Sequence, residues 1–201
     1  MSQELFLTKS AVVGAGLMGS QIGLVLAMGS EKTMLLCRRQ ESLDTALVNI
    51  RRHAEDLERH DLLGGETPDT VIARIRTTTD LDKAVGDADY VVESISEILE
   101  AKQELFGRMD SIAPRDTVLA SNTSGLPITT LAEGVEHKDR VAGAHFVQPG
   151  HIVPVVEVIR TAATSDATMA RNCEIWQRLG RMPLRCARRR DGGAREQRRG
   201  G

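Results

Sequence analysis

Aromatic side chains are scarce in this chain of 201 residues, which has three Phe, one Trp and one Tyr. The core must therefore be built from aliphatic side chains, and stacking platforms for single-stranded nucleic acid are excluded. A formal net charge of −2 also argues against general nucleic-acid binding. No apolar run is long enough to span a bilayer, and no basic region precedes an apolar one at the N-terminus. We therefore expect no nucleic-acid partner, no membrane partner and a cytoplasmic location.

Cysteine is equally sparse, with only Cys37, Cys173 and Cys186. Their spacing fits no metal-binding motif, so we expect no metal site, and free thiols fit a reducing compartment. The apolar share of 41% and the charged share of 27% are typical of soluble globular proteins. The length suits one ordinary domain, or one domain plus a fragment.

Short apolar runs alternate with amphipathic stretches along the chain. The runs predict strands at Ser10–Val13, Thr33–Cys37, Ile75–Thr78, Tyr90–Ser94, Thr117–Ser121, Val141–Phe146 and Val153–Ile159. The amphipathic stretches predict helices at Leu17–Met28, Glu41–Arg59, Ile98–Ile112, Ile128–Ala132 and Asp166–Leu179, with a loop at His60–Asp69. Alternation of this kind predicts an α/β, Rossmann-type, doubly wound and mostly parallel sheet with helices on both faces. We expect residues 1–184 to form one dinucleotide-binding domain.

A G-x-G-x-x-G turn joins the first predicted strand to the first predicted helix. Gly14 permits the turn, Gly16 lets a phosphate approach the backbone, and Gly19 lets the helix pack against the strand. Leu17 and Met18 begin that helix, whose N-terminal N–H groups point toward the same spot. The turn therefore predicts a binding site for a dinucleotide pyrophosphate.

His145 and Glu157 lie on two successive predicted strands, equally spaced about His151. A hairpin centred there would place the two side chains opposite each other. A histidine can accept the proton of a hydroxyl near neutral pH, and a carboxylate on its far nitrogen would orient the ring. The pair is thus a candidate for acid–base catalysis. We treat the remaining histidines as surface or loop residues: His53, His60, His137 and His151.

Polar side chains follow the strand that ends at Ser121. Asn122 and Ser124 then lie at the carboxyl end of the sheet, where ligands bind in open α/β folds.

Five patches, taken together and in order, resemble the NAD-binding domain of the 3-hydroxyacyl-CoA dehydrogenases. They are Val91–Glu97, Lys102–Phe106, Ala120–Ser124, Ala144–Pro149 and Pro154–Val158, and the resemblance extends over about Lys9 to Leu184.

The resemblance implies hydride transfer between a hydroxyacyl substrate and a nicotinamide cofactor. It implies a catalytic pair of His145 and Glu157, with Ser124 and Asn122 positioning the substrate oxygen. It also implies that Glu97 and Lys102 contact the cofactor. For Lys102, an ordinary solvated helix start is an equally good interpretation.

The second predicted strand departs from the pattern of NAD-specific enzymes. Such enzymes usually carry Asp or Glu near the position of Cys37 to hold the ribose hydroxyls, whereas here Arg38 and Arg39 follow. Arginines suit a 2′-phosphate, so the cofactor is NAD or NADP, with a slight preference for NADP. Arginines that stack on adenine or face water are the alternative.

The segment at residues 50–61 has mixed charge and no lysine, whereas family members usually carry lysines there for the phosphates of coenzyme A. An acyl-CoA remains the expected substrate. Two alternatives stay open: a dehydrogenase of a small free hydroxy acid, such as gulonate, and a nucleotide-binding remnant without catalysis.

Residues 185–201 are rich in arginine and glycine and lack apolar periodicity. We expect a disordered basic tail, and its composition resembles a coding sequence read out of frame. The resemblance implies a further helical domain that forms the dimer and completes the substrate site, and we expect its absence to impair turnover.

Overall fold

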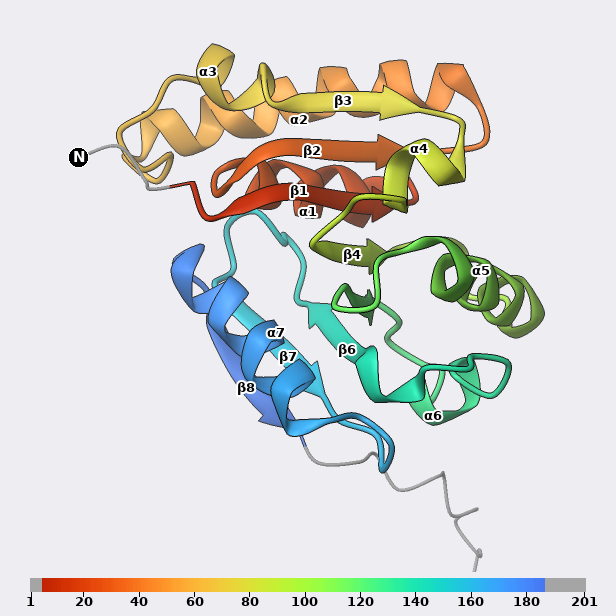
Figure 1. The fold of residues 1–201 in the computed structure, drawn as a ribbon. Helices are drawn as coiled ribbons and strands as arrows, with labels where there is room; N and C mark the ends of the chain where they lie inside the picture. Colours follow the sequence, from red (N-terminus) through yellow and green to blue (C-terminus); the bar gives the residue numbers. More distant parts are fainter. Residues whose placement is uncertain (1–4, 187–201) are drawn as a thin grey trace, which may run out of the picture.

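The computed structural model describes residues 5–186, which form one eight-stranded sheet (Figure 1). The strands are β1 (Leu7–Val13), β2 (Ser30–Leu36), β3 (Ile75–Thr78), β4 (Tyr90–Glu93), β5 (Val118–Ser121), β6 (Val141–Phe146), β7 (Val155–Ile159) and β8 (Met182–Cys186). Their spatial order is β3-β2-β1-β4-β5-β6-β7-β8. Strands β1 to β6 run parallel, β7 is antiparallel to β6, and β8 is parallel to β7. The predicted Rossmann-type sheet is confirmed.

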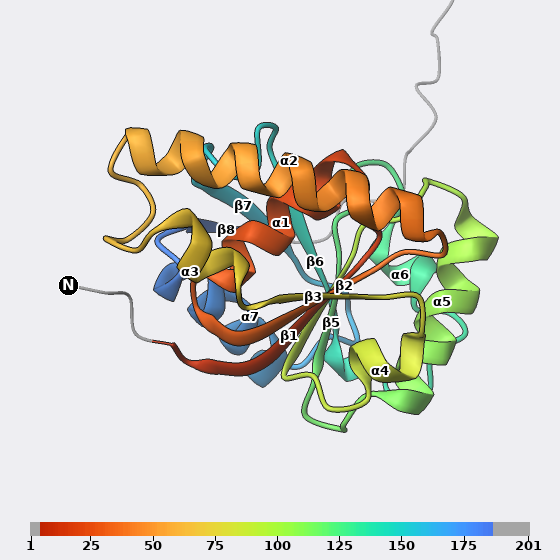
Figure 2. The ribbon, with the colours of Figure 1, turned by 90° about the horizontal axis from the view of Figure 1, so that it is seen from above.

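Helices cover both faces of this sheet (Figure 2). They are α1 (Leu17–Ala27), α2 (Gln40–Arg59), α3 (Pro68–Ile72), α4 (Leu81–Val85), α5 (Leu99–Ile112), α6 (Ile128–Leu131) and α7 (Asp166–Arg178), with a short 3₁₀ turn, η1 (Lys138–Arg140). Side chains of α1, α2 and α7 share one apolar core, and side chains of α4, α5 and α6 share another. Alternation along β1 explains the two cores, because Val12 joins the first while Ala11 and Val13 join the second.

The apolar spacing of the longest helix shows why it lies on the sheet. The buried residues of α2 recur three or four positions apart, which places them on one face: Leu43, Ala46, Ile50, Ala54 and Leu57. Central strands are instead buried on both faces, and every residue of β4 is buried. The one-sided burial of the helix and the two-sided burial of the strand together place helices on the faces of a buried sheet.

The structure extends or shortens the predicted elements by a few residues and adds four that the sequence pattern did not predict: α3, α4, η1 and β8. Helix α3 begins at Pro68, so the predicted loop at residues 60–69 ends earlier than expected. The expected tail also begins later, since Arg185 and Cys186 belong to β8, paired with β7. Residues 187–201 lie outside the described part of the chain. Within residues 5–186, no helix combines the length and apolarity needed to cross a bilayer.

Candidate active site

The glycine turn has the geometry that phosphate binding requires. Gly14 has φ of +117°, and a Cβ there would lie 2.3 Å from the Ser94 carbonyl oxygen. A Cβ on Gly19 would lie 1.8 Å from the Gly14 oxygen, so both positions exclude larger residues. A Cβ on Gly16 would meet no atom within 4 Å, and no side chain caps the N-terminus of α1 there. Gly16 therefore faces open space at a free helix N-terminus, which fits a diphosphate.

The turn lies where the sheet order reverses. Strand β1 pairs with β2 on one side and β4 on the other, so the ends of β1 and β4 open a crevice. A groove of about 590 Å³ begins at this crevice, within the usual size range of small-molecule sites. Its lining includes Gly16, Leu17, Met18, Ser94, Glu97, Lys102, Asn122, Ser124, His145 and Gln148. One continuous depression thus connects the glycine turn to the candidate catalytic histidine.

His145 and Glu157 face each other across the antiparallel pair β6 and β7, as the hairpin hypothesis predicted. His145 Nδ1 lies 2.8 Å from Glu157 Oε2, and the two side chains are 23% and 38% exposed. A carboxylate on Nδ1 favours the tautomer with its proton on that nitrogen, which leaves Nε2 as the acceptor. The geometry provides a positioned base at the edge of the groove.

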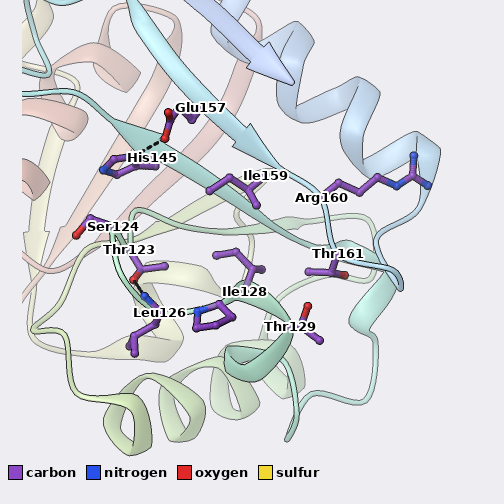
Figure 3. Close-up of a pocket in the computed structure, with 11 residues that line it drawn as sticks. Thr123, Ser124, Leu126, Ile128, Thr129, His145, Glu157, Ile159, Arg160 and Thr161 are labelled. Atoms are coloured by element: carbon purple, nitrogen blue, oxygen red, sulfur yellow. Dashed lines mark hydrogen bonds and ion pairs between the residues drawn. The ribbon is translucent and has the colours of Figure 1, made fainter. Parts of the chain in front are cut away.

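A smaller pocket of about 30 Å³ is also lined by His145. Figure 3 shows His145, Ser124 and Thr123 at one end of this pocket, with Glu157 joined to the imidazole by a hydrogen bond and Arg160 directed away. Ile128 and Ile159 form its apolar wall. Ser124 and His145 line both depressions, so a ligand that reaches one meets the other at these two residues.

Asn122 connects three strand ends. Its Oδ1 accepts a hydrogen bond from the Phe146 N–H at 2.9 Å, and its Nδ2 donates to Ser94 Oγ at 3.3 Å. The amide therefore fixes the end of β6, and with it His145, relative to β4 and β5. Ser124 is exposed, and its backbone N–H donates to Glu97 Oε1 at 2.9 Å.

Glu97 accepts several hydrogen bonds at the rim of the groove. Thr123 Oγ1 donates to its two oxygens at 2.8 and 3.0 Å, and Lys102 Nζ lies 3.2 Å from Oε2. Partial burial acts to raise the pKa of Glu97, but the bonds from Thr123, Ser124 and Lys102 outweigh it and lower the pKa. Glu97 is thus a stable carboxylate that positions the loop containing Ser124.

Lys102 is buried, with a side chain only 1% exposed, so a solvated helix start is the wrong interpretation. Its Nζ lies 2.5 Å from Oε1 of Glu93, which is fully buried at the end of β4. The other oxygen of Glu93 accepts a hydrogen bond from Ser121 Oγ at 2.6 Å. Lys102 therefore neutralises a buried carboxylate, and it still lines the groove where a cofactor would lie.

The end of β2 lies beside the glycine turn, since the Gly14 N–H donates to the Leu36 carbonyl at 2.8 Å. Arg38 and Arg39 follow and are exposed. Burial raises the pKa of the Cys37 thiol, whereas hydrogen bonds from the backbone of Arg39, Ala15 and Arg38 and from Ser42 outweigh it and lower the pKa. Hydrogen-bond donors thus surround Cys37, the position at which NAD-specific enzymes usually carry an acidic residue that holds the ribose hydroxyls.

Two functional residues escaped the sequence interpretation. Glu93 lies in the patch Val91–Glu97, but the sequence analysis assigns no role to it. A carboxylate directly after the apolar run Tyr90–Val92 is itself a signal of a buried ion pair. Gln21 in α1 accepts a hydrogen bond from the Gly150 N–H at 2.7 Å. This bond fixes the β6–β7 connection to the cofactor helix, and no local sequence pattern indicates it.

Comparison with known proteins agrees with this geometry. Residues 9–189 match the family described as the NAD-binding domain of 3-hydroxyacyl-CoA dehydrogenase. The chain is 34% identical to the mitochondrial hydroxyacyl-coenzyme A dehydrogenase of Homo sapiens over 194 residues, which cover 92% of this chain and 60% of that protein. It is 38% identical to a probable 3-hydroxybutyryl-CoA dehydrogenase of Deinococcus radiodurans over 178 residues, 89% of this chain and 63% of that protein.

Among solved structures, 3-hydroxybutyryl-CoA dehydrogenase from Escherichia coli K12 superposes with a TM-score of 0.85 at 32% identity. That match covers 92% of this chain and 39% of the other. The chain thus spans about 60% of the length of these two curated relatives. By sequence and by fold, the chain belongs to the family of 3-hydroxyacyl-CoA dehydrogenase NAD-binding domains.

Proposed function

We propose that this chain binds a nicotinamide dinucleotide across the Gly14–Gly19 turn and catalyses hydride transfer with a 3-hydroxyacyl-CoA. The observation that carries the proposal is the continuous groove from the open face of Gly16 to the His145–Glu157 pair. The free N-terminus of α1 and the space above Gly16 fit a diphosphate. When bound, the cofactor supplies the hydride acceptor for oxidation of the hydroxyl carbon.

His145 acts as the base in this proposal. Its Nε2 accepts the proton of the substrate 3-hydroxyl while the carbon–hydrogen bond breaks, so that a carbonyl forms. Glu157 holds Nδ1 and stabilises the imidazolium that results. Ser124 and Asn122 position the substrate oxygen, and Glu97 holds the loop that carries Ser124.

The cofactor is NAD or NADP, and the residues after β2 favour NADP. Arg38 and Arg39 are exposed beside the turn, where a guanidinium can pair with a 2′-phosphate. Titration of the chain with NADH and with NADPH tests this preference. Tighter binding of NADPH, lost in Arg38→Ala, supports it, and tighter binding of NADH refutes it.

The acyl-CoA class is supported by the names of the relatives and by the apolar wall of Ile128 and Ile159 beside His145. The test of the function is cofactor reduction by the full chain with 3-hydroxybutyryl-CoA and, separately, with gulonate. We expect turnover with the thioester, and a loss of roughly 10²-fold or more in His145→Gln.

Cofactor binding measured on the same His145→Gln sample is the control for folding. Turnover with gulonate alone would assign the small hydroxy-acid class instead. If both the wild type and His145→Gln bind the cofactor but give equal cofactor-reduction signals, the chain would be a nucleotide-binding remnant without catalysis.

A further inference from the structure

Three side chains with metal-binding chemistry meet outside the two depressions that His145 lines. His53 and Asp56 lie one turn apart on α2, and His151 lies in the connection between β6 and β7. Their candidate ligand atoms all lie within 4.8 Å of one another. The rings of the two histidines lie 4.0 Å apart between centroids, tilted by 34°.

His151 has an unsatisfied polar atom at this cluster. The residue is only 5% exposed, and its Nδ1 has no hydrogen-bond partner among residues 5–186. An orphaned buried nitrogen is costly unless something binds it. His151, which the sequence analysis treats as a surface or loop residue, does lie in a loop, but its side chain is buried.

Burial, more than the neighbouring charges, favours the neutral imidazoles that metal ions bind. Burial first, and then the proximity of His53, lower the pKa of His151 to about 4, with Arg181 acting in the same direction and Asp56 against it. Burial also lowers the pKa of His53, aided by Arg52 and opposed by Asp56. Both histidines are thus available as ligands at neutral pH.

Besides Arg52, two cations near the cluster oppose a bound metal ion. Arg181 donates to the His151 carbonyl at 3.1 Å, and Arg59 pairs with one oxygen of Asp56. The Arg59 side chain is 71% exposed, so it can leave that oxygen at little cost. The Asp56 carboxylate supplies the negative charge that a divalent ion needs.

We propose that His53, Asp56 and His151 bind a divalent first-row transition metal ion. Two imidazoles and one carboxylate suit Zn²⁺ and its neighbours, with open positions left for water. The ion would connect α2 to the β6–β7 connection, whose Gly150 is already bound to Gln21. Metal binding would therefore stabilise the segment that follows His145 without contacting the catalytic groove.

Calorimetric titration of the full chain with Zn²⁺ tests the site. We expect saturable binding of one ion and a higher melting temperature. Loss of an outer-shell partner alone costs roughly 10–100-fold in metal affinity, so His53→Gln, Asp56→Asn or His151→Gln should each cost at least about tenfold. His60→Gln, at the end of the same helix, is the matched control and should bind Zn²⁺ like the wild type.

Co²⁺ identifies the ligand type. A visible Co²⁺ spectrum without a thiolate charge-transfer band would support the proposed ligands, and a thiolate band would overturn them in favour of the cysteines. Unchanged Zn²⁺ affinity in His53→Gln and Asp56→Asn, or loss of binding in His145→Gln instead, would also overturn the proposal. His53 and Asp56 are both half-buried, so their variants keep the test valid if His151→Gln fails to fold.

Discussion

At the scale of single residues, His145 depends on a partner that lies directly across the sheet. The 2.8 Å contact from Nδ1 to Glu157 fixes the ring and its tautomer. This pairing was predictable from the sequence, since equal spacing about a turn determines which residues of an antiparallel pair face each other.

Replacement of Glu157 by Gln tests the role of the carboxylate. The amide keeps the size of the side chain but cannot stabilise the imidazolium, so turnover should fall by roughly 10²-fold with cofactor affinity unchanged. Steady-state kinetics and cofactor titration measure the two quantities. An unchanged kcat would show that Glu157 has no part in proton transfer.

The Glu93–Lys102 pair was not predictable in the same way. The two residues belong to different elements, and only the packing of α5 against the end of β4 brings Nζ to the carboxylate. From the sequence, a cofactor contact and a solvated helix start were equally good interpretations of Lys102, because residue spacing does not show whether a side chain is buried.

Lys102→Met should destabilise the fold by roughly 3–5 kcal/mol, because it leaves the Glu93 carboxylate buried without a counter-charge. The double variant Glu93→Gln with Lys102→Met should recover much of this loss, since the unpaired charge is gone. Urea unfolding measures both. If the double variant is as unstable as the single one, the charge is not the cause.

At the scale of elements, the strand–turn–helix unit of β1, Gly14–Gly19 and α1 was predictable except for the start of β1, which lies at Leu7 rather than at Ser10. Strong periodicity and the glycine motif acted together there. The short helices α3 and α4 were not, because five residues show no period. Strand β8 was missed because its burial follows neither period, with Met182 and Leu184 exposed.

Two glycines of the turn, Gly16 and Gly19, should respond differently to substitution by alanine. Gly19→Ala should destabilise the fold, because its Cβ would collide with the Gly14 oxygen. Gly16→Ala has room and an ordinary φ of −75°, so its melting temperature should stay close to the wild type. Its methyl group projects where a phosphate would lie, so cofactor affinity should fall by about tenfold or more. Full cofactor affinity in Gly16→Ala would contradict a diphosphate at this position.

At the scale of the whole molecule, a buried ionic cluster joins α5 to the segment around η1 that leads into β6. Asp110 of α5 accepts hydrogen bonds from Arg140 Nε at 2.9 Å and from the backbone N–H groups of Glu136 and His137. Burial acts to raise the pKa of Asp110, but the Arg140 and His137 contacts outweigh it and hold the pKa below the ordinary 3.8.

Asp110 should make the stability of the protein depend on pH. Because its folded pKa lies below 3.8, its contribution is complete above that value and is lost as the pH falls toward the folded pKa. Asp110→Asn should therefore cost roughly 1.5–3 kcal/mol at neutral pH and progressively less in acid. Urea unfolding at several pH values measures this, with the exposed Asp116→Asn as the control. A cost that does not change with pH would exclude the titration of Asp110 as its source.

The central claim concerns one bound molecule in one groove, and a crystal structure of the chain with a nicotinamide dinucleotide tests it most directly. We expect the diphosphate at Gly14–Gly19 and the nicotinamide ring in the groove facing His145, with Glu157 still on Nδ1. A glycine turn without cofactor at saturating concentration, or a nicotinamide ring remote from His145, would contradict the account.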